Sequence, residues 1–145
     1  MNCQSGALVM IVEDEGLIAL EMMEFLVRKG YRITEPVSSG EEAVERCGGA
    51  LLPDLILMDI TLSGKIDGIE AARRIRERHR IPVIILTARE DDRTVKRIRE
   101  LGPEGYLVKP SGREELLAAI SLVLGSRDRQ RPGETTKTTI PAPRD

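Results

Sequence analysis

The chain has 145 residues, of which 41% are hydrophobic and 32% charged, and its formal net charge is −2. No run of about 18 apolar residues occurs, and the first residues have neither the basic region nor the apolar core of a signal peptide. We therefore expect a soluble domain with no membrane span. Cys3 and Cys47 form no CxxC pair, and we interpret them as free thiols of a cytoplasmic protein.

Short apolar runs alternate with amphipathic helical patterns along residues 7–125, which predicts five βα units in series. The expected strands are 7–12, 31–37, 54–59, 81–88 and 105–110. The first expected helix carries Ile18, Met22, Phe25 and Leu26 on one face and stops at Gly30. The second carries Ala43, Val44 and Cys47. The other three are expected over residues 68–79, 92–102 and 113–125.

The first, third and fourth strands are continuously apolar, as expected for a parallel sheet covered by helices on both faces. With right-handed crossovers, five such strands favour the doubly wound α/β order 2-1-3-4-5. In this order the winding reverses between the first and third strands, and a ligand binds outside their carboxyl ends. Residues 1–6 and the Pro- and Thr-rich segment 126–145 have too few apolar side chains to fold, so we expect a disordered N-terminus and a disordered tail or linker stub.

Polar side chains stand at the carboxyl ends of the predicted strands. They are Glu13, Asp14, Asp59, Thr87 and Lys109. The predicted order brings the three carboxylates together, where they repel one another unless a cation lies among them. Oxygen ligands without His or Cys suit Mg²⁺. Each residue alone has an ordinary alternative, such as a helix cap or a solvated loop side chain, but all of them fall on one edge of the sheet.

These residues carry a resemblance. The segments "VMIVEDE", "DLILMDI", "DGIEAARRIR", "PVIILTA" and "GYLVKP" together resemble the receiver domain of two-component response regulators, over residues 7–125. The resemblance implies a flavodoxin-like (βα)5 fold, with Asp59 as the phosphoacceptor. It also implies Mg²⁺ held by Glu13, Asp14, Asp59 and the backbone carbonyl of Thr61.

Further roles follow from the same resemblance. Thr87 matches the switch hydroxyl, Lys109 the lysine that contacts phosphate, and Tyr106 the aromatic side chain whose orientation follows the switch. The implied donor is a sensor histidine kinase or phosphotransfer protein. The implied output is a protein partner or a homodimer through the face of the fourth helix, fifth strand and fifth helix, where Arg93 and Arg97 stand. Nucleic-acid binding within this chain is not expected.

The loop after Asp59 departs from the common family pattern. It reads "ITLSGKI", in which Leu62-Ser63-Gly64 replaces the usual Met-Pro, so that the loop Leu62-Ser63-Gly64-Lys65 has one residue more than is common. The shape of this loop stays open, and so does the possibility that Thr61 and Arg89 admit or block a hydrolytic water.

Three other functions are compatible with an aspartate at the end of a central strand of an α/β sheet. An aspartyl phosphatase or mutase would have a second Asp two residues after the nucleophile, where Thr61 stands. A nucleotide-binding fold would have GxxxxGK[ST] or GxGxxG, and both are absent. A degenerate receiver that only binds proteins remains the alternative to a phosphorylated switch.

Overall fold

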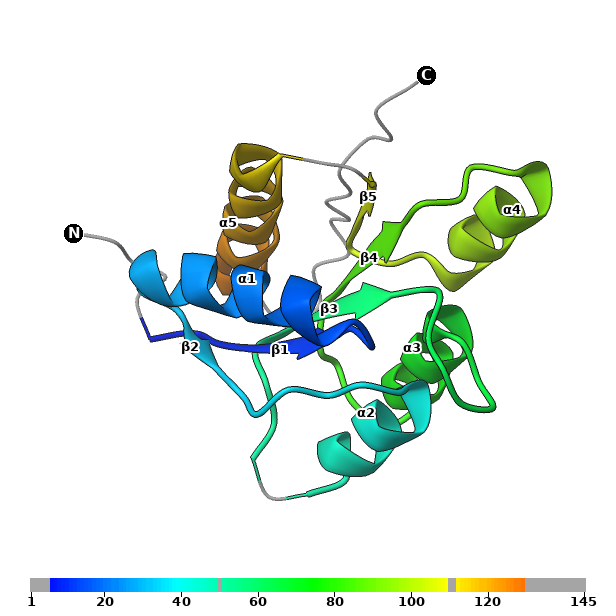
Figure 1. Cartoon of the computed structure of the whole chain (residues 1–145), viewed down its shortest axis with the longest axis horizontal. Coiled ribbons are helices and arrows are strands. Elements are labelled where there is room, and N and C mark those ends of the chain that lie inside the picture. Colours follow the sequence, from blue (N-terminus) through cyan, green and yellow to red (C-terminus); the bar gives the residue numbers. More distant parts are fainter. Residues whose placement is uncertain (1–5, 50, 110–111, 130–145) are drawn as a thin grey trace.

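The computed structural model describes residues 6–49, 51–109 and 112–129 of the chain. The strands form one parallel sheet in the order β2-β1-β3-β4-β5, which confirms the predicted α/β topology (Figure 1). They are β1 (Leu8–Val12), β2 (Arg32–Ile33), β3 (Leu55–Asp59), β4 (Val83–Thr87) and β5 (Gly105–Val108). The winding reverses between β1 and β3, and the predicted acidic residues stand at the carboxyl ends of these two strands.

Within the described residues one helix follows each strand, and the helices cover both faces of the sheet (Figure 1). They are α1 (Gly16–Arg28), α2 (Gly40–Cys47), α3 (Gly68–Arg76), α4 (Asp92–Leu101) and α5 (Arg113–Arg129). Successive strand residues point to opposite faces. On β3, Ile56 and Met58 belong to the core beneath α2, α3 and α4, whereas Leu55 and Leu57 belong to the core beneath α1 and α5. Both faces are buried, which explains the continuously apolar strands.

The second strand is shorter than the predicted 31–37. Only Arg32–Ile33 is a strand, and Val37 then makes a single bridge to Val12. Pro36 has no backbone N–H, so it cannot continue the ladder at this edge of the sheet.

Three helical details also differ from prediction. α3 ends at Arg76 rather than at residue 79, and α5 continues through Gly125 to Arg129 because no proline follows until residue 132. In α4, the helical spacing of Val95, Ile98 and Leu101 predicts that these three face inward. Instead, Thr94 is buried together with Ile98, whereas Val95 and Leu101 are half-buried. The predicted disordered segments 1–6 and 126–145 lie outside the described residues, except for Gly6 and the end of α5.

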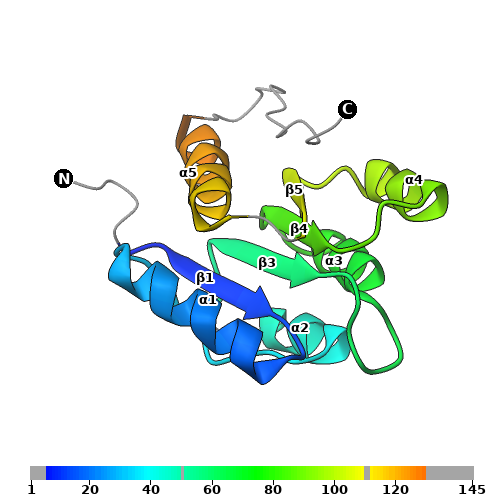
Figure 2. The same cartoon turned by 45° about the horizontal axis from the view of Figure 1, so that its top comes forward.

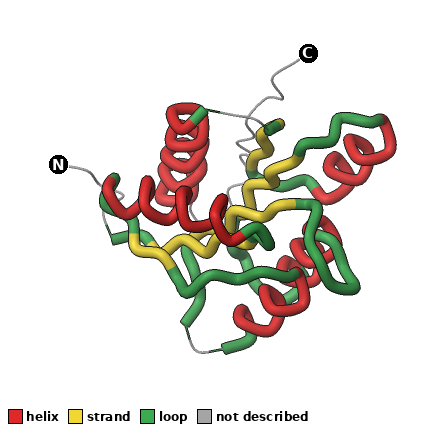
Figure 3. The backbone as a smooth tube through the Cα atoms, viewed as in Figure 1, coloured by secondary structure: helices red, strands yellow, loops and turns green. Residues whose placement is uncertain are grey.

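The strands are parallel, so their carboxyl ends meet at one edge of the sheet. The arrowheads of β1 and β3 point to this edge (Figure 2), and the long loop between β3 and α3 projects from it (Figures 2 and 3). Asp59 and the residues that follow β1 are thereby placed beside this loop. None of the helices that the structure describes is long and apolar enough to cross a membrane.

Candidate functional site

Three carboxylates converge where β1 and β3 lie side by side. Glu13 and Asp14 directly follow β1, and Asp59 is the last residue of β3. One oxygen from each of the three lies within 4.8 Å of the others. Glu13 is only 4% exposed and Asp59 5%, whereas Asp14 is exposed. The prediction that these acids meet is confirmed, and two of their charges are buried and need compensation.

Lys109, one residue beyond β5, supplies a positive charge to this cluster. Its Nζ lies 3.1 Å from Asp59 Oδ2 and 3.3 Å from Glu13 Oε1. The backbone orients it, since the Lys109 N–H donates to the Thr87 carbonyl across the β4–β5 pair at 2.6 Å. The amine therefore bridges the two buried carboxylates. Pro110, next to it, lies outside the described residues.

The pKa values of Glu13 and Lys109 reflect the opposing effects of burial and of neighbouring charges. Burial raises the pKa of Glu13, and the neighbouring charge of Asp59 raises it further against the opposing effects of the Glu15 N–H and Lys109. Burial alone would lower the pKa of Lys109, but the charges of Asp59 and Glu13 and the hydrogen bonds to both outweigh it and raise that pKa. The lysine therefore stays protonated, and Glu13 loses its proton less readily than a solvated glutamate does.

The donor set fits a divalent cation with a preference for oxygen. All three side chains are carboxylates, and the exposed position of Asp14 leaves room for metal-bound water, which Mg²⁺ retains. Thr61 is exposed, and its N–H lies 3.4 Å from Asp59 Oδ1. The role of the Thr61 carbonyl as a ligand stays a prediction.

Thr87, at the end of β4, is 1% exposed. Its hydroxyl donates to the Arg89 carbonyl at 3.1 Å and accepts from the Arg89 N–H at 2.8 Å. The Thr87 hydroxyl is thus engaged with its own loop and not with Asp59. Arg89 itself is solvent-exposed and lies 3.5 Å from the carboxylate of Asp91.

Tyr106 lies on β5 opposite Ile85 of β4. Its ring is half-buried against the core cluster that also takes in Leu101 at the end of α4. The predicted aromatic residue is therefore on the face of the sheet that α4 covers, and its role in a switch stays a prediction.

The loop whose shape the sequence left open is anchored at two points. The Ser63 N–H donates to Asp14 Oδ2 at 3.1 Å, and the Lys65 N–H donates to Glu41 Oε2 at 2.6 Å. Gly64 between them has φ +108°, a conformation that favours glycine. Glu41, in the first turn of α2, was not among the predicted site residues. No local pattern marks it, because its partner lies 24 residues further along the chain.

Asp67 and Gly68, at the start of α3, each have a structural role. Asp67 caps the helix by accepting from the Glu70 N–H at 2.9 Å. Gly68 packs directly on the backbone of the predicted phosphoacceptor, since a Cβ at Gly68 would lie 2.0 Å from the Asp59 carbonyl oxygen. Only glycine permits this approach.

Arg97 does not belong to a free surface of α4. Its guanidinium donates to both carboxylate oxygens of Asp67, at 2.6 and 3.1 Å. Burial alone would raise the pKa of Asp67, but the hydrogen bonds from Arg97 and from the Glu70 N–H, with the charge of Arg97, outweigh it and lower that pKa. Arg97 therefore ties α4 to the start of α3, whereas Arg93 is exposed and remains available to a partner.

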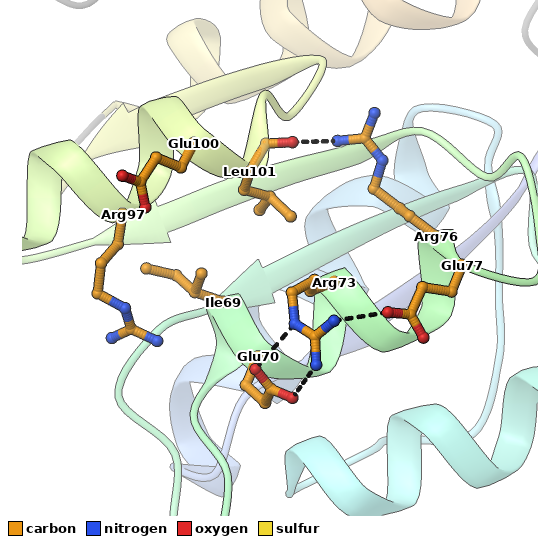
Figure 4. Close-up of a pocket in the computed structure, with 8 residues that line it drawn as sticks. All are labelled: Ile69, Glu70, Arg73, Arg76, Glu77, Arg97, Glu100 and Leu101. Carbon is orange, nitrogen blue, oxygen red and sulfur yellow. Dashed lines mark hydrogen bonds and ion pairs between the residues drawn. The ribbon is translucent and has the colours of Figure 1, made fainter.

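A groove of about 390 Å³ runs between α3 and α4 (Figure 4). Most charged side chains that line the groove are paired with one another, or with carboxylates or backbone carbonyls of the same two helices and their ends. Arg73 bridges Glu70 and Glu77, and Arg76 donates to the Leu101 and Gly102 carbonyls at 3.0 and 2.7 Å. These contacts favour a structural contact between the two helices over an anion-binding site.

Comparison with known proteins identifies the arrangement. The family model described as the response regulator receiver domain matches residues 9–121. The chain is 39% identical over 116 residues to the transcriptional regulatory protein PdtaR of Mycobacterium tuberculosis, covering 80% of this chain and 56% of that protein. It is 38% identical over 122 residues to the transcriptional regulatory protein AfsQ1 of Streptomyces coelicolor, covering 84% and 53%. The chain thus spans about half the length of the curated relatives it matches.

Solved structures agree with the family match. The N-terminal domain of a response regulator/sensory box/GGDEF 3-domain protein from Carboxydothermus hydrogenoformans superposes with a TM-score of 0.76 at 34% identity, over 83% of this chain and 96% of that one. A CheY-like receiver domain protein from Methanospirillum hungatei shares the fold with a TM-score of 0.78 at 22% identity, over 86% of this chain and 98% of that one. With its parallel five-stranded sheet and acidic edge, the chain belongs to the receiver domain family of two-component response regulators.

Proposed function

We propose that this domain accepts a phosphoryl group on Asp59 from a phosphohistidine of a sensor histidine kinase or phosphotransfer protein, in a reaction that depends on Mg²⁺, and that the phosphorylated form presents an altered protein-binding surface. The observation that carries the proposal is the position of Asp59. Its carboxylate is 5% exposed at the carboxyl end of the central strand, beside two further acids and the amine of Lys109. We also propose a cytoplasmic location, where phosphorelay partners and reduced thiols occur together.

The transfer needs a nucleophile and a means to neutralise the moving group. A carboxylate oxygen of Asp59 forms the new O–P bond while the P–N bond of phosphohistidine breaks, and the electron pair of that bond goes to the departing imidazole nitrogen. Lys109, held 3.1 Å from Asp59, brings a protonated amine to the phosphoryl oxygens. Bound between Glu13, Asp14 and Asp59, Mg²⁺ would neutralise a further phosphoryl oxygen and offset the repulsion among the acids.

The local structure also supports a switch. Phosphorylation adds about −1.5 to −2 charges at the site. Thr87 is the buried hydroxyl at the end of the next strand, and to reach a phosphoryl oxygen it has to give up its bond to the Arg89 carbonyl. That exchange costs about 0.5–1.5 kcal/mol, less than a charge-assisted bond to phosphate returns. Movement of Thr87 would open space that Tyr106 can enter, and α4 would repack as a shift between two populations.

The proposed output surface is the face of α4, β5 and α5, which would bind a downstream protein or a second copy of the chain. Arg93 is an exposed arginine of α4, and we propose that it contributes to this surface. PdtaR and AfsQ1 are named as transcriptional regulatory proteins. Control of transcription is accordingly a proposal for the whole protein that carries this domain, and not a property of the receiver itself.

The decisive test is phosphorylation in vitro. The protein is incubated with acetyl phosphate, with and without Mg²⁺, and the intact mass is measured. We expect a mass increase of about 80 Da that requires the metal and that Asp59→Asn abolishes. Titration with beryllofluoride should shift the amide resonances of the β4–α4 loop in the wild type alone. A protein that stays unmodified with Mg²⁺ present would instead be the degenerate receiver that acts only as a binding module.

A further inference from the structure

The loop beside the acidic cluster is held from α2. Glu41 lies in the first turn of that helix, and its Oε2 accepts the Lys65 N–H at 2.6 Å. A single parallel bridge joins Ser39, the residue that caps α2, to Ser63. Gly64 passes so close to the carboxylate that a Cβ there would lie 2.6 Å from Glu41 Oε1. Residues 63–65 are thus seated on the amino end of α2.

The same loop holds a predicted metal ligand. The Ser63 N–H donates to Asp14 Oδ2 at 3.1 Å. Asp14 is exposed, and this is the only hydrogen bond that its carboxylate makes within the described part of the chain. An exposed aspartate with one restraint samples several rotamers when that restraint is lost. With Oδ2 restrained, the carboxylate remains beside Glu13 and Asp59 and keeps its other oxygen for a ligand.

We propose that Glu41 is a positioning residue of this receiver, which sets the orientation of the metal ligand Asp14 through the backbone of residues 63–65. The inference rests on the proposed function, because it assumes that Asp14 binds Mg²⁺. The proposal also gives a role to the extra residue of the loop after Asp59. The longer loop reaches α2, and the acceptor on α2 replaces the rigidity that a shorter loop would have by itself.

The mechanism requires a hydrogen-bond acceptor at position 41 and not a negative charge. Glu41 Oε1 has no hydrogen-bond partner among the described residues, so the hydrogen bond to the Lys65 N–H is made by Oε2. The Lys65 N–H also lowers the pKa of Glu41, as expected for an acceptor oxygen. An amide oxygen in Glu41→Gln can accept the same N–H, whereas Glu41→Ala removes it. The two variants therefore distinguish a role of Glu41 in positioning the loop from direct electrostatic attraction between its negative charge and the cation.

The test uses the full chain, free of metal and then titrated with Mg²⁺. Amide hydrogen exchange at Ser63 and Lys65 reports loop order before metal is added, and amide resonance shifts report the Kd for Mg²⁺. We expect Glu41→Ala to speed exchange at both amides and to raise the Kd about threefold to tenfold, below the effect of losing a direct partner of a ligand. Glu41→Gln should stay within about twofold of the wild type. Glu45→Ala, which removes an exposed acid from the same helix, is the matched control and should change neither quantity.

A second route reaches the same contact from the loop. Gly64→Ala pushes against the Glu41 carboxylate and strains a positive φ, so it should also raise the Kd. Its effect should be smaller in the Glu41→Ala background, because the two residues share one contact. This cycle keeps the test valid if one single variant is too unstable to measure.

The outcomes distinguish the inference from the function on which it rests. A wild-type protein that shows no Mg²⁺ response overturns both. A wild type that binds Mg²⁺ with Glu41→Ala equally tight overturns the inference alone. Equal losses in Glu41→Gln and Glu41→Ala would show that charge, not position, is what Glu41 supplies, and would also overturn it.

Discussion

Gly68→Ala adds one methyl group at the point where α3 rests on the phosphoacceptor strand. The new Cβ would lie 2.0 Å from the Asp59 carbonyl oxygen and 3.0 Å from the Ile60 Cα. An ordinary contact is 3.4–4 Å, so α3 and β3 would have to separate by at least about 1.4 Å. Both partners are backbone atoms, and no side-chain rotation relieves the clash.

The expected change in the free energy of unfolding is the sum of two destabilising contributions and one stabilising contribution. Overpacking costs about 1–3 kcal/mol, and loss of the Gly68 N–H bond to the Ile60 carbonyl costs about 0.5–1.5 kcal/mol. Replacing a glycine with ordinary φ stabilises by about 0.4–1 kcal/mol through the unfolded chain. The expected net loss is about 2 kcal/mol, or roughly 4–8 °C in Tm for a chain of this size.

Two other glycines provide the control, because Gly16, Gly40 and Gly68 all begin a helix. A Cβ at Gly16 would meet nothing within 4 Å, so Gly16→Ala should stabilise by about 0.4–1 kcal/mol. A Cβ at Gly40 would lie 2.9 Å from the Ile66 side chain, which can partly move, so Gly40→Ala should fall between the other two.

The assay is urea unfolding followed by circular dichroism, with the free energy compared at a common m-value. The expected order of stability is Gly16→Ala above wild type, then Gly40→Ala, then Gly68→Ala. If Gly68→Ala were as stable as Gly16→Ala, helix propensity would govern this position, and the close approach to Asp59 would be refuted as the reason for the Asp-Gly pair.

Three further predictions address charge and burial. Arg97→Gln should cost about 1 kcal/mol at pH 7, because it removes the half-exposed pair with Asp67. Because the pKa of Asp67 is lowered in the folded protein, the pair stabilises the fold above the pKa that Asp67 has in the unfolded chain, and this stabilisation is lost as the pH falls through the folded-state pKa. The free energies of unfolding in urea should therefore converge in acid for variant and wild type. A constant difference between them would contradict the pairing. Lys109→Met should destabilise the metal-free protein by about 2 kcal/mol, since two buried carboxylates lose their cation, and Mg²⁺ should restore part of the loss in thermal unfolding; an unchanged Tm would show that the lysine compensates nothing. Burial raises the pKa of Cys47 to about 11, so in a Cys3→Ser background a thiol reagent at pH 8 should modify the protein only upon unfolding, and rapid reaction in the native state would be inconsistent with that burial.

The fold was predictable because its determinants are local in the sequence. Apolar runs such as residues 55–58 and the helical spacing of Ile69, Ala72 and Ile75 define element types, and parallel winding leaves few strand orders. Apart from the buried face of α4, the errors occur at element ends, as at β2 and at the end of α5, where single residues and tertiary contacts decide the boundary.

Much of the acidic site was predictable for the same reason. A residue at the carboxyl end of a strand, or just beyond it, has its place in space determined once the strand order is known, which applies to Glu13, Asp14, Asp59 and Lys109. Their convergence needed only the topology and no knowledge of side-chain packing.

Contacts between segments distant in the chain were decided by the tertiary structure alone. The sequence by itself determined the βα succession, the sheet order and the acidic edge. It did not determine that Glu41 accepts the Lys65 N–H, that Arg97 pairs with Asp67, or that Gly68 rests on the Asp59 carbonyl. These contacts depend on how far a loop bends and how closely a helix packs, to within an ångström. Such distances arise from the packing of the whole core, because no local pattern of residues encodes them.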